Sequence, residues 1–92
     1  MNAEPEGAGE PAQFAVVLLN DDVTPMEFVV EVLQQVFGNE HDEAVKAMLA
    51  VHHQGSGICG LYGQEEAQRL AKAVIDRAQA SGYPLQCIVR PE

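Results

Sequence analysis

The chain has 92 residues, of which 14 are acidic and 5 are basic, and its formal net charge is −9. This length suits one small domain and excludes a large enzyme with a deep cleft for several substrates. The basic residues are few and scattered, which argues against binding to nucleic acid through its phosphate backbone. No apolar run approaches the roughly 20 residues that span a bilayer, so we expect a soluble protein without membrane contact.

The first 13 residues are rich in glutamate, proline and glycine, a composition that buries too little apolar surface to fold. We therefore expect a flexible acidic tail over residues 1–13 and a single domain over residues 14–92. No positively charged apolar leader precedes the domain, and the two cysteines, Cys59 and Cys87, have no CxxC spacing. These features predict a cytoplasmic protein whose thiols pack in the core.

The domain begins with a strand and a helix. Residues 14–19 form a short apolar run with β-branched members, which predicts a buried strand. A helix start follows, with Thr24 as the cap, Pro25 at the first helical position and Glu27 completing a capping box. Gly38-Asn39 is the expected end of this helix.

A second helix is predicted over about residues 42–53, ending at Gln54-Gly55. Its apolar face is expected to hold Val45, Met48, Leu49 and His52. The link between the two helices is short, which favours antiparallel packing. In that arrangement the end of the second helix returns to the start of the first.

A strand over residues 57–62, a helix over residues 64–80 and a strand over residues 85–89 complete the chain. Gly57 and Gly60 indicate a close approach of the backbone to a neighbouring element. The element order is βααβαβ. It predicts an α+β fold in which a three-stranded antiparallel sheet packs on three helices.

A candidate site lies where the polar loop Asn20-Asp21-Asp22 meets His52. All these side chains can accept hydrogen bonds, and the loop carries no lysine or arginine, so a cation rich in donors is the expected ligand. A ring of mostly apolar side chains should surround the cluster: Leu18, Thr24, Met26, Val29, Met48, Val51 and Leu85. A ligand with an ammonium group beside a bulky apolar group would fit such a site.

Simpler interpretations of these residues stay open. The loop can be a plain turn, and His52 can be a core histidine with a satisfied hydrogen bond. A zinc site from Asp22, His52 and His53 is disfavoured because adjacent histidines on a helix face different directions. Hydrolysis by Asp21 and Asp22 is disfavoured because adjacent loop carboxylates are not set across a scissile bond. We expect no metal and no cofactor.

Two long motifs resemble a known family. LLNDDVTPMEFV at residues 18–29 and MLAVHHQG at residues 48–55, followed by Ile58-Cys59-Gly60 and Pro84-Leu85, are similar to ClpS, the bacterial adaptor family of the N-end rule. The resemblance covers about residues 14–91. It implies a small adaptor, not an enzyme, that binds an exposed N-terminal Leu, Phe, Tyr or Trp of N-degron substrates.

The resemblance also implies roles and partners. The adaptor would hand its substrate to a ClpA-type AAA+ unfoldase, which feeds ClpP, and we expect it to act as a monomer. By position, Asn20, Asp22 and His52 would hold the substrate α-amino group, with Asp21 acting beside them through water. The apolar ring given above would form the side-chain pocket, with Met26 as a gatekeeper against β-branched residues.

The unfoldase-facing surface would include Glu65 and Arg69 at the start of the third helix. Two positions depart from the family pattern: Val23 replaces an aromatic residue of some relatives, and Leu70 stands where a lysine is expected. Two other classes of function stay open. One is an interaction domain like that of the ribosomal stalk, without N-terminal residue recognition, and the other is a small metal-dependent enzyme.

Overall fold

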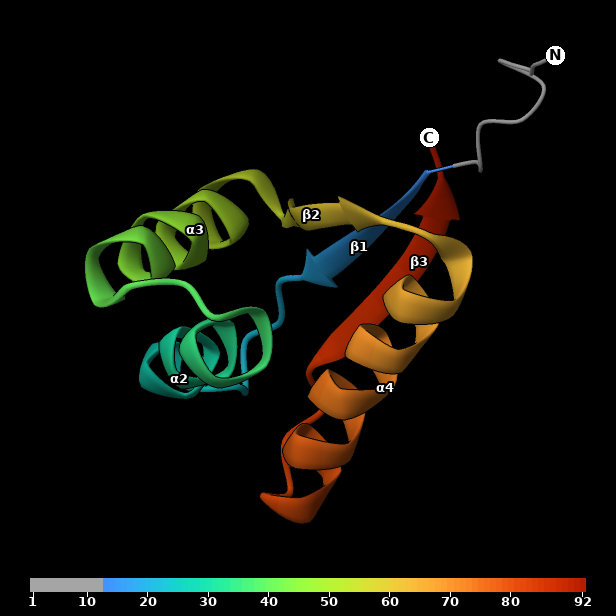
Figure 1. Ribbon diagram of the computed structural model, residues 1–92. Helices are drawn as coiled ribbons and strands as arrows, with labels where there is room; N and C mark the ends of the chain where they lie inside the picture. The colour runs from blue at the N-terminus through green and yellow to red at the C-terminus, as the bar shows by residue number, and fades with distance from the viewer. Residues whose placement is uncertain (1–12) are drawn as a thin grey trace, which may run out of the picture.

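The computed structural model describes residues 13–92, so the predicted acidic tail lies outside the described residues except for Gln13. Its elements, in chain order, are β1 (Phe14–Leu19), α2 (Met26–Phe37), α3 (His41–Gln54), β2 (Ser56–Tyr62), α4 (Gln64–Ala80) and β3 (Gln86–Pro91) (Figure 1). The predicted order βααβαβ is confirmed. The last two strands are displaced from their predicted bounds by only one or two residues at an end.

The three strands form one antiparallel sheet in the order β2-β1-β3. β1 is central because it is apolar on both faces: the residues from Ala15 to Leu18 are each 2% exposed or less. Val16 and Leu18 belong to the main core, whereas Val17 lies on the other face between Ile58 and Ile88. The prediction of a buried first strand is therefore confirmed.

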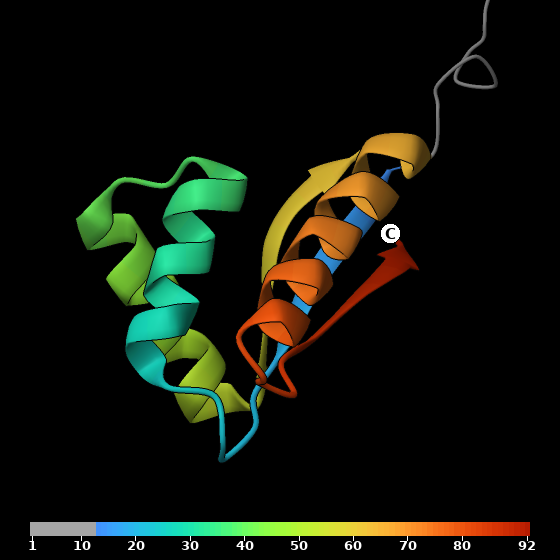
Figure 2. The same ribbon diagram turned by 90° about the horizontal axis from the view of Figure 1, so that it is seen from below.

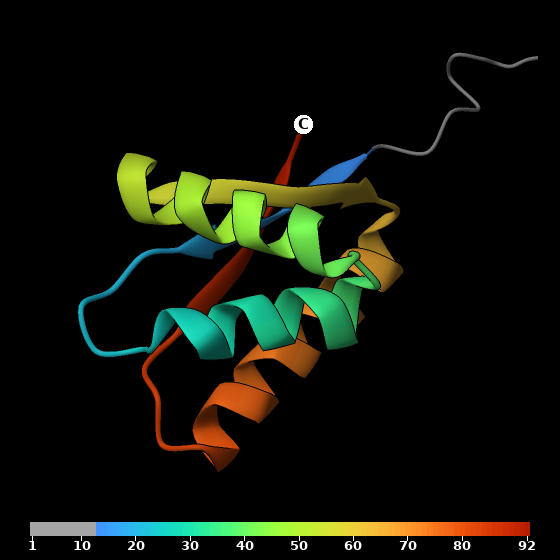
Figure 3. The ribbon, with the colours of Figure 1, turned by 90° about the vertical axis from the view of Figure 1, so that its left-hand side faces the viewer.

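The helices cover one face of this sheet and share a single core with it. α4 lies along the sheet and contacts all three strands, while α2 and α3 form an antiparallel hairpin beside it (Figures 2 and 3). The core joins side chains from each layer, including Leu18, Leu33, Met48 and Val74. Among residues 13–92, no helix has the length and apolar character needed to cross a membrane.

The start of α2 differs from the prediction. The residue at the N-cap is Pro25, and no side chain caps the helix, so the predicted capping box of Thr24 and Glu27 is wrong. The hydroxyl of Thr24 instead donates a hydrogen bond of 2.8 Å to Oδ2 of Asp21. The predicted end of the helix is confirmed, because Gly38 has a φ of 74° and its N–H donates to the carbonyl of Gln34.

The inward face of α3 is turned by about one residue from its predicted position. The buried side chains are Ala44, Met48 and Val51, whereas Leu49 is 40% exposed. His52 follows Val51 by about 100° around the helix and is exposed. The prediction that His52 lies on the buried stripe, and with it the core-histidine interpretation, is wrong.

The two thiols pack as predicted. Both cysteines are free, with Cys87 buried and Cys59 partly buried. Burial raises the pKa of each thiol to about 12, with the nearby Cys87 adding to the shift at Cys59. Each thiol is therefore neutral at physiological pH and behaves as a small apolar core residue.

Candidate functional site

Sheet pairing brings the loop after β1 to the end of α3. Because β1 and β2 are antiparallel, Leu19 at the end of β1 pairs with Ser56 at the start of β2. The next residue, Asn20, donates its backbone N–H to the carbonyl of Gly55 at 2.9 Å. Asn20 is thereby fixed beside the last turn of α3, where His52 lies.

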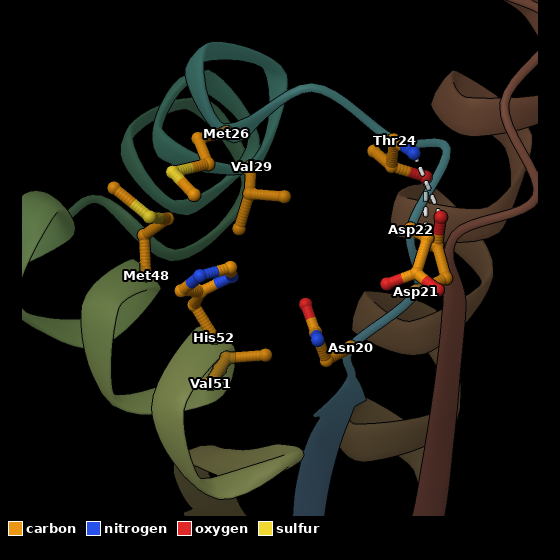
Figure 4. A pocket seen from close by; sticks show the side chains of 9 residues that line it. All are labelled: Asn20, Asp21, Asp22, Thr24, Met26, Val29, Met48, Val51 and His52. Carbon is orange, nitrogen blue, oxygen red and sulfur yellow. Dashed lines mark hydrogen bonds between the residues drawn. The ribbon is translucent and has the colours of Figure 1, made fainter.

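A pocket of about 160 Å³, called the main pocket below, opens between this loop, α2 and α3 (Figure 4). One side is polar and the other is apolar. Its lining residues are Asn20, Asp21, Asp22, Thr24, Met26, Val29, Met48, Val51 and His52. The structure therefore brings together all of the predicted amino-binding and pocket residues except Leu18 and Leu85.

Leu18 and Leu85 lie behind the main pocket. Leu18 is fully buried in the core cluster that also contains Val29 and Val51. Leu85 is 5% exposed and lines a separate hollow of about 10 Å³, again with Val29 and Val51. Both leucines therefore belong to the same core as Val29 and Val51 of the pocket wall.

Asp21 braces the loop. Its Oδ1 accepts hydrogen bonds from the N–H of Val23 at 2.8 Å and of Thr24 at 2.7 Å, and its Oδ2 accepts from the Thr24 hydroxyl. Partial burial raises the pKa of Asp21, but the bonds from Thr24 and Val23 outweigh it, so the pKa lies below the ordinary 3.8. Asp21 is thus an ionised clamp, while its exposed neighbour Asp22 also lines the pocket.

His52 lies at the rim between the polar and apolar sides. In Figure 4 its ring lies between Asn20 and the two methionines. The adjacent ring of His53 is 5.3 Å away in an edge-on arrangement, but it does not line the pocket. His53 is exposed, as predicted for a surface residue.

The glycine at the start of β2 determines how closely α3 approaches the sheet. A Cβ on Gly57 would lie only 2.7 Å from Cγ2 of Val51, a residue of the pocket wall. The sequence predicted a close backbone approach at Gly57 but gave no sign that the partner belongs to the site. The similar prediction for Gly60 is wrong, because the atoms nearest to a Cβ there belong to the side chain of Tyr62 in the same strand, with its hydroxyl oxygen at 2.6 Å.

The chemistry of the main pocket is that of a cation acceptor joined to an apolar cavity. Its polar side chains offer carboxylate, amide and imidazole acceptors, and none of its lining residues is lysine or arginine. Met26 is 44% exposed at the rim and Met48 is 9% exposed deeper in the wall. Within residues 13–92, no three His, Cys, Asp or Glu side chains gather as metal ligands would.

The residues predicted to face an unfoldase lie elsewhere, at the start of α4. Glu65 and Arg69 are exposed, and Arg69 forms an ion pair of 3.2 Å with Glu66. Leu70, where the resemblance led us to expect a lysine, is 9% exposed and belongs to the buried face of the helix. This surface is therefore polar and separate from the main pocket.

Comparison with known proteins identifies the family. The family model described as "ATP-dependent Clp protease adaptor protein ClpS" matches residues 9–88. The chain belongs to the ClpS family. The ClpS proteins of Neisseria gonorrhoeae and Campylobacter jejuni are 52% and 49% identical to it, over 86% and 90% of this chain and 76% and 86% of theirs.

A solved structure has the same fold. Agrobacterium tumefaciens ClpS2, bound to L-phenylalaninamide, is 36% identical with a TM-score of 0.89, over 90% of this chain and 100% of that one. ClpS proteins are adaptors of the Clp protease and not themselves proteases. The resemblance and the fold class predicted from the sequence are both confirmed.

Proposed function

We propose that this protein binds the N-terminal residue of proteins that begin with Leu, Phe, Tyr or Trp and delivers them to a ClpA-type AAA+ unfoldase with ClpP. The observation that carries the proposal is the main pocket, which joins an all-acceptor cluster to an apolar cavity of about 160 Å³. An N-terminal residue combines a cationic amino group and a side chain on one carbon. The pocket is complementary to both.

The polar side distinguishes a chain terminus from an internal residue. A free α-amino group has an ordinary pKa near 7.7–8.0 and carries three N–H donors when protonated. The amide oxygen of Asn20, the carboxylate of Asp22 and the imidazole of His52 supply three acceptors for them, and charge-assisted bonds of this kind are strong. An internal peptide N–H has one donor and no charge, so it cannot satisfy this cluster.

The apolar side selects the side chain. Burial of a Leu or Phe side chain contributes about 1.5 to 3 kcal/mol, which is enough to favour it strongly over a small residue. Val29, Met48 and Val51 form the wall of this cavity, and Met26 lies at its rim. L-phenylalaninamide, the ligand of the Agrobacterium relative, supports the proposal because it has a free amino group and a bulky apolar side chain.

Fluorescence anisotropy with two labelled peptides tests the proposal. The peptides are identical except that the N-terminal Leu is either free or acetylated, and only the free peptide should bind. Asn20→Ala, Asp22→Ala and His52→Ala should each weaken binding roughly tenfold to a hundredfold, because each removes a charge-assisted bond. His53→Ala is the matched control, since this exposed histidine does not line the pocket.

Equal binding of both peptides would refute recognition of the N-terminus. Binding of neither would favour the alternative of a stalk-like interaction domain.

Delivery is a separate step that we assign to the exposed surface of Glu65 and Arg69. Glu65→Ala with Arg69→Ala should slow unfoldase-dependent degradation of a Leu-led substrate while leaving peptide affinity unchanged; degradation at the normal rate would refute this assignment. We expect delivery to occur in the cytoplasm.

A further inference from the structure

A second hollow lies directly beside the main pocket. It has a volume of about 330 Å³, follows the seam between α2 and α3, and is called the α2–α3 groove below. The groove and the main pocket share Met26 and Met48, so these two side chains form the wall between them. The residues lining the groove are Met26, Glu27, Val30, Glu31, Gln34, His41 and Met48.

The groove combines an apolar floor with an acidic rim. Val30 and Met48 are 9% exposed, while Glu27 and Glu31, one helical turn apart, are exposed carboxylates. Within residues 13–92 neither carboxylate forms an ion pair; the pairs there are Arg69 with Glu66, Lys72 with Asp76 and Arg90 with Glu92. A side chain with a long aliphatic stem and a terminal cation therefore matches both the floor and the rim.

The direction of a bound chain leads to this groove. An N-terminal α-carbon carries its amino group, side chain and carbonyl in diverging directions. With the amino group at Asn20 and His52 and the side chain in the cavity, the carbonyl points out of the pocket, past the exposed rim residue Met26 that the groove shares. A chain that continues over Met26 enters the α2–α3 groove.

The repeat of an extended chain identifies the residue that reaches the groove. Alternate side chains of an extended chain point to the same side, and they are roughly 7 Å apart. The side chain of substrate residue 1 points into the main pocket. The side chain of substrate residue 3 therefore points to the same side, roughly 7 Å further along and beyond the wall formed by Met26 and Met48. Residue 2 points away from the protein surface.

We propose that the α2–α3 groove is a second subsite of this adaptor, which takes the side chain of Arg or Lys at residue 3 of the substrate. The inference rests on the proposed function, because the position of residue 3 follows from an N-terminal residue held in the main pocket. The second subsite would give the adaptor a preference for a basic residue at substrate position 3, which a pocket for the N-terminal residue alone would lack. The cation is held by Glu27 and Glu31, and its stem packs on Met48 and Val30.

The test uses labelled peptides that all begin with a free Leu and differ at one later position. Arg is placed at residue 2, 3 or 5, and citrulline, which has nearly the same shape without the charge, replaces it at residue 3. Anisotropy is measured at pH 7, where most of the peptide α-amino groups carry their proton. The variants are Glu27→Gln with Glu31→Gln, and Glu66→Gln with Asp76→Asn on α4, a control that removes the same number of charges outside the groove.

We expect Arg at residue 3 to bind about three- to fivefold more tightly than citrulline, the range of a partly exposed ion pair. The gain should disappear in the Glu27→Gln, Glu31→Gln variant, persist in the Glu66→Gln, Asp76→Asn variant, and be smaller for Arg at residues 2 and 5. Equal gains at all three positions would overturn the subsite and indicate general attraction to the net charge of −9. Loss of binding by every free-Leu peptide would instead refute the proposed function, and the subsite with it.

Discussion

Substitution of Gly57 by alanine should displace the wall of the main pocket. The new Cβ would lie 2.7 Å from Cγ2 of Val51, so the two carbons must separate by about 0.8 Å to reach an ordinary contact of about 3.5 Å. Val51 is 5% exposed and β-branched, so it has no alternative rotamer of low energy on the helix. Overpacking of this kind costs about 1 to 3 kcal/mol in the free energy of unfolding.

Urea denaturation measures this cost, and a double mutant identifies its origin. Gly57→Ala should lower the free energy of unfolding by about 2 kcal/mol, which corresponds to a fall of roughly 10 °C in Tm for a domain of this size. In a Val51→Ala background the same change should cost almost nothing, because the clashing methyl group is gone. Gly63→Ala is the control, since a Cβ there meets nothing within 4 Å, and it should cost less than about 1 kcal/mol.

Equal costs of Gly57→Ala with and without the Val51 methyl groups would refute the steric explanation. Peptide binding gives a second measure of the same displacement. Gly57→Ala should weaken the binding of a free Leu-led peptide, because Val51 lines the main pocket. If Gly57→Ala lowers the free energy of unfolding as expected but binds the peptide with unchanged affinity, then the clash displaces the sheet and leaves the pocket wall in place.

Other predictions concern the loop, the rim and the core. The pKa of Asp21 is lower in the folded protein than its ordinary value of 3.8, so its ionised carboxylate should stabilise the fold fully above pH 3.8. This contribution should be lost as the pH falls through the lowered pKa. Urea denaturation should therefore show that the difference in the free energy of unfolding between wild type and Asp21→Asn decreases in acid. Met26→Ala should admit peptides led by Ile or Val, as measured by anisotropy, and no gain for such peptides would count against a gatekeeper. With pKa values of about 12, Cys59 and Cys87 should react slowly with iodoacetamide at pH 8 and rapidly in denaturant. Leu33→Ala, at a fully buried position, should cost about 2 to 5 kcal/mol in urea denaturation.

The sequence predicted most of the fold because its local signals agree with its tertiary packing. The apolar run over residues 14–19 became the central strand, and Gly38 ended α2 as expected. The start of α2 was misjudged because Thr24 has two partners within reach of its hydroxyl: the first turn of the helix and the carboxylate of Asp21. Local sequence favours both, and the path of the loop, which depends on the whole fold, decides for Asp21.

The site was predictable as a set of residues but not as a geometry. For α3, a stripe through Val45, Leu49 and His52 and a stripe through Ala44 and Val51 fit the helical period almost equally well. The larger side chains favoured the first stripe, yet the small Ala44 is fully buried in the core cluster. His52 consequently lies at the rim, where its nitrogen atoms can meet a ligand, and not inside the core.

The two halves of the main pocket differ in rigidity, and this difference suits their separate tasks. On the polar side, the backbone N–H of Asn20 is tied to Gly55 at 2.9 Å and Asp21 fixes the following turn, so the backbone that carries the loop acceptors is held before a ligand arrives. On the apolar side, Met26 and Met48 are unbranched and can adapt to side chains of different shape. Disruption of the rigid half should therefore weaken every N-terminal ligand alike, whereas changes to the methionines should alter which side chain is preferred.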